Sequence, residues 1–336
     1  MIQRWLLFWL VLLSGVAWCW PTVERAWPGW MPGPFDPFLD SAGILAWLIA
    51  LAMFAVGTLL PHDELRQVAR RWPAVLGGTA IQYTSMPLLA WVAAKLMGYE
   101  GDQLIGLVVV GCVPGAMASN VLTHNAGGNT SFSVSLTTLA TLVSPLTVPL
   151  ALWLILGRSD VRFHPLDTSR SLLLTVVLPV AAGYTVMRLV PTWRKVLQRC
   201  GPIVANVVIL WIIAIVVAKN RDQLGSAALA VVPPLLAVNL AGYLVGNWGA
   251  RAMRLPVDMQ RALTLEIGMQ NAGVGTFLVL TFFPDRPAAA VAPAVYTFGC
   301  MFTGTALAHW WAWRGRRQQL AAPETAPESV NNGGSR

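Results

Sequence analysis

Long apolar runs, separated by short polar connections, recur along the whole chain. Each run has about twenty residues, which is enough for a helix to cross the hydrocarbon core of a bilayer. The longest uncharged stretch, Gln103 to Gly157, exceeds one span, and the turn-forming sequence HNAGGNT at 124–130 divides it. The pattern predicts an all-α polytopic membrane protein with ten transmembrane helices. The predicted spans are about 2–20, 42–60, 73–97, 103–123, 129–157, 170–190, 201–218, 225–249, 259–283 and 287–313.

Composition supports a membrane protein and argues against a soluble one. Charged residues are 11% of the chain and apolar residues 56%, whereas a soluble domain has about a quarter charged residues. The net charge of +8 comes from residues in short connections rather than on one soluble face, so we expect no nucleic-acid partner. The four cysteines lie in four separate segments without a CxxC pair, which is neither a metal spacing nor a disulfide framework.

The placement of basic residues predicts the orientation in the membrane. Four connections rich in Arg or Lys fall on the side of Arg4 if there are ten spans, so both termini are predicted to be cytoplasmic. The connection at 158–170, with three arginines, is the exception. Trp18 before Cys19 is too large for a signal cleavage site, so an uncleaved first span is expected. Residues 1–314 are predicted to form one membrane domain, and the Pro-, Ser- and Gly-rich segment 315–336 a disordered cytoplasmic tail.

Polar and helix-breaking residues interrupt the fourth predicted span. The sequence GCVPGAMASN at 111–120 places two glycines, Pro114, Ser119 and Asn120 at membrane depth. In lipid every backbone N–H and C=O must be paired within the protein, so such a break is tolerated only in a protein interior or a cavity.

A second break lies five spans later, in the ninth span. Glu266 precedes IGMQNAGVG, and the other acidic residues all lie in predicted loops, at span ends or in the tail. A carboxylate at membrane depth is costly and by default marks a functional site. Because five is odd, spans four and nine enter from opposite sides, as in two inverted five-helix repeats. The alternative is a pair of kinked packing helices, since Gly and Pro are common in membrane helices.

The residues near the two breaks indicate a hard cation. One carboxylate among neutral oxygens, without a His or Cys cluster, suits such a cation better than zinc. Ser133 and Thr137 are spaced i, i+4, which places both hydroxyls on one helix face, and Gln82 is a single amide in an apolar run. Each hydroxyl could also simply bond its own helix or a neighbour.

At these residues the sequence resembles the bile acid:sodium symporter family, particularly its bacterial members. VGCVPGAMASNVLTHNAGGNTSFSVSLTTLATLVSPLTVPL is similar to the family's signature in spans four and five, TLEIGMQNAGVG to its ninth-span element, and IQYTSMP fits in span three. The resemblance covers about residues 40 to 310. It implies a panel domain (about 2–60 and 170–218) and a core domain (about 73–157 and 225–313), with helices four and nine crossing inside the core.

The same resemblance implies two sodium sites. The first would use Ser119, Asn120, Ser133, Thr137 and Glu266. The second would use Gln82, Glu266, Gln270 and the backbone carbonyls of Ile267 and Met269. No organic cofactor is expected.

The residues that would face the substrate differ from the family pattern. Met117 stands where relatives have a small hydroxyl residue, and Cys300 and Met301 stand where some bacterial relatives have His and Asn. Asn271 is retained, and with Asn120 these residues form the expected substrate set.

The sequence thus predicts sodium-coupled uptake of an organic anion, a carboxylate or a sulfonate, by alternating access, and an enzymatic role is not expected. A proton-coupled exporter or antiporter that titrates Glu266 remains an alternative. An intramembrane enzyme is another, although the sequence has no HExxH, no paired membrane aspartates and no SxxK at depth. The oligomeric state is open, and a monomer is the working expectation.

Overall fold

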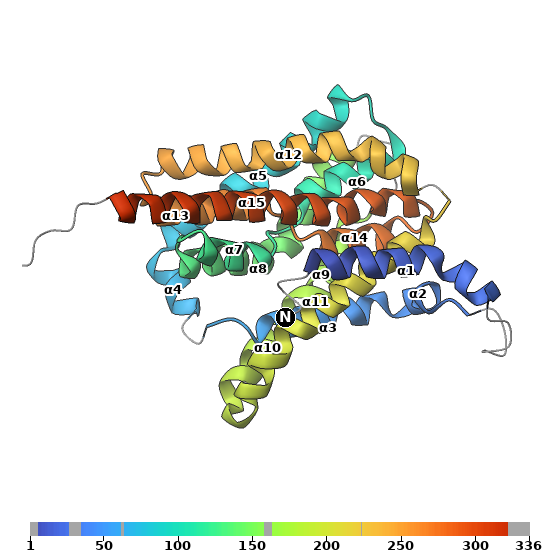
Figure 1. The fold of residues 1–336 in the computed structure, drawn as a ribbon, viewed down its shortest axis with the longest axis horizontal. Helices are drawn as coiled ribbons and strands as arrows, with labels where there is room; N and C mark the ends of the chain where they lie inside the picture. Colours follow the sequence, from blue (N-terminus) through green and yellow to red (C-terminus); the bar gives the residue numbers. More distant parts are fainter. Residues whose placement is uncertain (1–5, 27–34, 62–63, 158–162, 223, 322–336) are drawn as a thin grey trace, which may run out of the picture.

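The computed structural model describes residues 6–26, 35–61, 64–157, 163–222 and 224–321, and within these ranges it is almost entirely helical. The only extended pairing in the described part is an isolated bridge between Gly115 and Gln270. The prediction of an all-α protein is therefore confirmed. Seen in Figure 1, most of the long helices run roughly along one direction of the molecule.

Most of the uninterrupted helices are long, several contain prolines, and some adjoin short turns of other helix types. They are α1 (Leu6–Ala26), α2 (Pro37–Asp40) with η2 (Ser41–Ile44) and α3 (Leu45–Gly57), α4 (Glu64–Arg70), α5 (Trp72–Leu96), α8 (Thr130–Leu156), α9 (Pro165–Leu172) with η3 (Leu173–Val177) and α10 (Leu178–Leu189), η4 (Pro191–Trp193) with α11 (Arg194–Lys219), α12 (Leu224–Ala252), and η5 (Pro287–Ala290) with α15 (Val291–Ala321).

Two further segments are interrupted helices. The first consists of α6 (Gly101–Cys112) and α7 (Ala118–Asn125), and the second of α13 (Val257–Gly268) and α14 (Ala272–Phe282). Both interruptions lie inside the stretches that the sequence singles out, 111–120 and 266–275. The broken-helix predictions are therefore confirmed at both places.

Six helical segments of the described part are both long and apolar enough to cross a membrane. They are Pro37–Gly57, Thr130–Leu156, Pro165–Leu189, Arg194–Lys219, Leu224–Ala252 and Pro287–Gly315. The interrupted helices fall short because each half is only about half a span in length. Helix α5 has the length, but Thr79, Gln82, Thr84 and Ser85 make its middle polar. Ten spans therefore remain a prediction.

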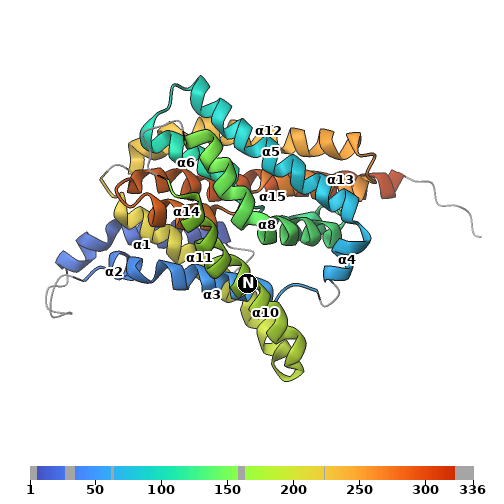
Figure 2. The same cartoon turned by 180° about the vertical axis from the view of Figure 1, so that it is seen from behind.

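The helices pack in two groups. Helix α3 packs against α10 and α11, and α1 packs against α11, while α12 packs against α5, α13 and α15. Figures 1 and 2 show α1, α3, α10 and α11 on one side of the molecule and α5, α6, α12 and α15 on the other. The group that contains α3 is held closely by glycines: a Cβ on Gly57 would meet the backbone of Val180 at under 3.0 Å, and one on Gly183 would meet that of Phe54. Small residues let membrane helices approach in this way.

Helix α15 extends beyond the boundary predicted for the membrane domain. The tail was expected from residue 315, yet the helix continues to Ala321. Arginines spaced four residues after tryptophans explain the extension: the Arg314 guanidinium lies 4.2 Å from the Trp310 ring centroid, and that of Arg317 lies 4.1 Å from the Trp313 ring. Such i, i+4 contacts stabilise a helix in water as well as in lipid. The remainder of the predicted tail, 322–336, lies outside the described residues.

Candidate functional site at the crossing of two interrupted helices

The two unwound segments cross and pair with each other. Ala116 N–H donates a hydrogen bond of 2.8 Å to the Met269 carbonyl, and Asn271 N–H donates one of 2.7 Å to the Pro114 carbonyl. Gly115 and Gln270 thus face each other in an antiparallel bridge. Pro114 has no N–H and cannot continue α6. The backbone groups released by one break are satisfied by the other, as burial away from water requires.

The Glu266 side chain lies at this crossing and is completely buried. Ser119, on α7, donates its hydroxyl to Glu266 Oε2 at 2.5 Å, and Thr137, on α8, donates to Oε1 at 2.7 Å. The carboxylate, carried by α13, is therefore positioned by side chains of two other helices, α7 and α8. Gly115 allows the close approach, because a Cβ there would lie under 3.0 Å from the Glu266 carboxylate.

Neutral oxygens surround the carboxylate on the side of α7 and α8. Asn120 Oδ1 lies 3.4 Å from Thr137 Oγ1, and the Thr123 hydroxyl donates to Ser133 Oγ at 3.3 Å. Asn120 Nδ2 is buried without a hydrogen-bond partner. All five residues expected at the first sodium site are buried: Ser119, Asn120, Ser133, Thr137 and Glu266. Hydrogen bonds connect Ser119, Asn120, Thr137 and Glu266, and Thr137 also donates to the backbone carbonyl of Ser133 at 3.1 Å.

Two residues of the second expected site, Gln82 on α5 and Gln270 in the second break, are close to each other. The side-chain amides of Gln82 and Gln270 lie 3.2 Å apart, and both are buried. With the Gln270 amide turned over, its nitrogen reaches the carbonyls of Val113 and Pro114 at 2.8 and 3.1 Å. The Met269 carbonyl already accepts from Ala116, which leaves it one lone pair, and Ile267 is fully buried.

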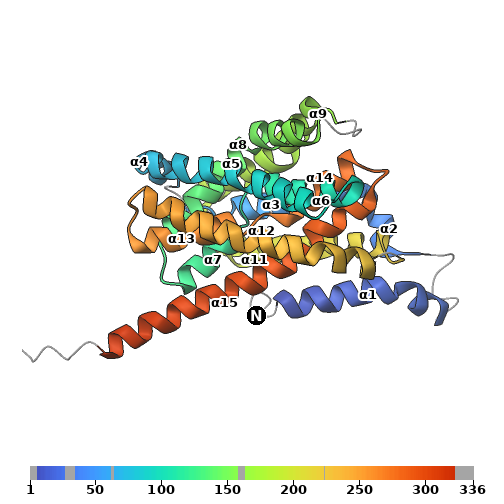
Figure 3. The same cartoon turned by 90° about the horizontal axis from the view of Figure 1, so that it is seen from above.

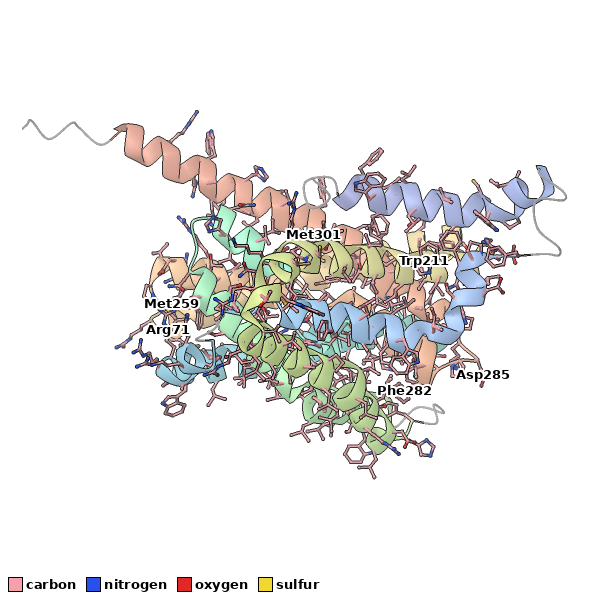
Figure 4. All side chains as sticks on the ribbon, turned by 90° about the horizontal axis from the view of Figure 1, so that it is seen from below. Arg71, Trp211, Met259, Phe282, Asp285 and Met301 are labelled. Atoms are coloured by element: carbon pink, nitrogen blue, oxygen red, sulfur yellow. The ribbon has the colours of Figure 1, made fainter. Side chains whose placement is uncertain are left out.

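The expected substrate residues are dispersed around the crossing. Met117 is half-buried and precedes α7. Asn271 caps α14, since its Oδ1 accepts from Val274 N–H at 3.3 Å. Cys300 is buried with its sulfur 3.6 Å from the Thr297 carbonyl of its own helix. Met301, labelled in Figure 4, is half-buried on α15, a helix that contacts α11.

A buried polar cluster behind the crossing was not predicted from the sequence. Asn239 Nδ2 and the Tyr296 hydroxyl each donate to the Gly268 carbonyl at 2.7 Å, at the end of α13. Thr303 donates to Asn239 Oδ1 at 2.7 Å, and the Tyr243 hydroxyl lies 3.1 Å from Thr303. The cluster fixes the carbonyl that the break releases, two residues after Glu266. A lone amide in an apolar run, the signal that singled out Gln82, is also present at Asn239.

Replacing Asn239 by Leu is expected to lower the free energy of unfolding by about 1–3 kcal/mol, since a buried carbonyl loses a donor. Thermal unfolding of the purified protein in detergent measures the effect. Tyr296→Phe removes the second donor to the same carbonyl, and the double variant is expected to lose more than the sum of the two single losses, because only then does the carbonyl have neither donor. Strict additivity would show that the two side chains do not act on one carbonyl.

The side chains at the crossing are of the types that bind a hard cation. The described residues contain no group of three or more His, Cys, Asp or Glu side chains that could hold a metal ion together. One carboxylate with hydroxyl and amide oxygens is instead the donor set of a hard cation. A buried carboxylate at the meeting point of two interrupted helices defines the class: an ion-coupled membrane transporter.

Comparison with known proteins identifies the group within that class. Residues 46–227 match the sodium bile acid symporter family, and the chain belongs to this family. It is similar to the sodium-dependent transporter YocS of Bacillus subtilis, with 32% identity over 278 residues covering 82% of this chain and 84% of that one. An ileal sodium/bile acid cotransporter of Oryctolagus cuniculus is 30% identical over 284 residues, 79% of each chain. A probable sodium/metabolite cotransporter, BASS1 of Arabidopsis thaliana chloroplasts, is 28% identical over 263 residues, 78% of this chain and 65% of that one.

The protein is thus a multi-pass membrane protein and a sodium-coupled transporter rather than an enzyme. The family resemblance seen in the sequence is confirmed, and sodium is the coupling ion.

Proposed function

We propose that the protein is a symporter that uses the sodium gradient to import an organic anion by alternating access. The observation that supports this most directly is the buried Glu266 carboxylate at the crossing, with hydroxyl donors from α7 and α8. An uncompensated carboxylate is expensive in this position, so a cation is expected to share the site during transport.

Two sodium ions are proposed to bind around Glu266. The first is held by Ser119, Asn120, Ser133, Thr137 and Glu266, and the second by Gln82, Glu266, Gln270 and the carbonyls of Ile267 and Met269. Two ions and one carboxylate leave about one net positive charge, which attracts a carboxylate or sulfonate. The N-terminal ends of α7, at Ala118, and of α14, at Ala272, add favourable helix dipoles. The anion is proposed to bind near Met117, Asn120, Asn271, Cys300 and Met301.

The proposed architecture is ten spans in two inverted repeats of five. Helices α1–α3 and α9–α11 form the panel, and α5–α8 and α12–α15 form the core. The packing of α3 with α10 and α11, and of α12 with α5, α13 and α15, supports this division. Alternating access would then be a movement of one group against the other around the crossing. The bias of Arg and Lys supports cytoplasmic termini in a bacterial inner membrane.

The direct test is uptake of a radiolabelled bile acid into vesicles that contain the purified protein. If two sodium ions accompany each monovalent anion, a tenfold inward sodium gradient at zero membrane potential supports about 100-fold accumulation, and one ion supports about tenfold. A thermal-shift screen of carboxylates and sulfonates, in sodium and in potassium, selects the substrate to use if the bile acid is not carried. Equal uptake in potassium, or accumulation driven by a pH gradient without sodium, would contradict the proposal.

A further inference from the structure

A cavity of about 240 Å³ lies at the end of the molecule where α15 projects, on the left in Figure 1 and again in Figure 3. It is formed by the end of α12, the start of α13 and the last part of α15. Its lining includes Arg251, Val257, Gln260, Arg261, Trp311 and Arg314. It is separate from the sodium site, which lies at the far end of α13.

Three guanidinium groups line this cavity without a carboxylate partner. No acidic residue is among the described residues that line it. The ion pairs found in the described ranges lie elsewhere, at Arg221–Asp36 and Arg286–Asp102. Asp258, one turn before Arg261, accepts instead from Asn129 Nδ2 at 2.8 Å. Among the residues that the structure describes, none therefore balances the positive charges of the cavity.

The Arg261 guanidinium is only partly hydrogen-bonded within the part of the chain that the structure describes. Its Nη1 donates to the Ala126 carbonyl at 2.7 Å, but its Nε is buried and has no hydrogen-bond partner. A buried unpaired donor on a charged group is costly, and an anion in the cavity would remove that cost.

The surroundings of the cavity are those of a membrane interface. Trp311 lies under the Arg261 guanidinium at 6.0 Å, and Trp310 under Arg314 at 4.2 Å. Tryptophans of this kind gather at the headgroup level of bilayers. Exposed apolar side chains at i, i+4 spacing run along α12 away from the cavity: Leu236, Leu240, Leu244 and Trp248. Such a stripe offers a path for an acyl chain.

We propose that the cavity binds the phosphate of an anionic phospholipid, with Arg251, Arg261 and Arg314 around the phosphate and the acyl chains along the α12 stripe. Arginines between membrane helices suit a phosphodiester because their planar groups donate paired hydrogen bonds. The lipid would join α12, α13 and α15, whose charged ends otherwise repel one another.

Binding of phosphatidylglycerol to the purified full-length protein, followed by native mass spectrometry, tests the proposal. The wild type is expected to retain phosphatidylglycerol in preference to phosphatidylcholine. The variant Arg251→Gln/Arg314→Gln is expected to bind it about 30-fold more weakly, from the loss of two charges at the headgroup. Arg188→Gln/Arg254→Gln removes the same charge from exposed positions outside the cavity and is expected to bind as the wild type does. Arg251→Lys/Arg314→Lys is expected to recover part of the loss.

Other outcomes would overturn the proposal. Equal retention of phosphatidylglycerol and phosphatidylcholine, or equal losses in the two glutamine variants, would show that the cavity does not select an anionic phospholipid. Displacement of phosphatidylglycerol by millimolar inorganic phosphate would assign the cavity to a free anion instead. The measurement does not involve transport, so a result that contradicts lipid binding would leave the proposed transport function unaffected.

Discussion

Replacing Glu266 by Gln is expected to abolish sodium-dependent uptake and to remove the stabilisation that sodium gives to the purified protein. Glutamine has nearly the shape of glutamate, so the hydrogen bonds from Ser119 and Thr137 to this position can partly persist, but the charge that holds the cation is lost. Removing one member of a buried charge pair typically costs 3–5 kcal/mol, so apparent sodium affinity should fall by about 100-fold or more.

The measurements are uptake in vesicles with a sodium gradient and thermal unfolding in sodium against potassium. In potassium the variant should unfold at or above the temperature of the wild type, because a buried carboxylate without its cation is itself unfavourable. Asp102→Asn serves as the control, since that carboxylate is part-exposed and paired with Arg286 away from the crossing. Sodium-dependent uptake by Glu266→Gln at wild-type rates would refute the assigned role.

Gly115→Ala is expected to disturb the proposed sodium site without changing any of its proposed ligands. The added methyl group would lie under 3.0 Å from the Glu266 carboxylate, which is closer than real Cβ atoms approach. Either the carboxylate moves away from Ser119 and Thr137, or the bridge between the two breaks opens. Overpacking of this kind costs about 1–3 kcal/mol, so sodium affinity should fall by about tenfold or more.

Gly299→Ala is the matched control for that experiment. Gly299 lies within α15, and a Cβ there would meet nothing within 4 Å. The same substitution should be neutral there, or stabilising by about 0.5–1 kcal/mol, because alanine favours a helix over glycine. The comparison uses sodium titrations of thermal stability. Equal sodium affinity in the two variants would show that a Cβ at position 115 does not displace the Glu266 carboxylate.

The sequence predicts the features that cost free energy in a membrane, namely the two helix breaks and the buried carboxylate. A carboxylate such as Glu266 is rare at membrane depth, and Pro114 lies among glycines and polar residues, so each singles out its position without any knowledge of the packing. The oxygens of the first predicted sodium site lie around Glu266 because two local signals, the break after Pro114 and the i, i+4 pair of Ser133 and Thr137, put hydroxyls on two helices that meet it.

Other features depend on partners that a single sequence does not reveal. The opposition of Gly115 and Gln270 is a register between segments far apart in the chain. The role of Asn239 depends on its hydrogen bond to the Gly268 carbonyl. In the sequence, an isolated asparagine in an apolar run is the same whether it bonds the backbone of another helix or binds a ligand. The length of α15 follows from arginine–tryptophan contacts, which a boundary drawn from hydropathy alone does not take into account.

The pairing of the two breaks also constrains how the protein is made. Ala116 N–H and the Pro114 carbonyl have their partners in Met269 and Asn271, which leave the ribosome about half a chain later. Until α13 and α14 insert, the first break has no backbone partner in the lipid, where unpaired groups cost several kcal/mol each. The first half of the chain is therefore not expected to be stable on its own, and the proposed ion site would be completed only late in synthesis, when the ninth predicted span arrives.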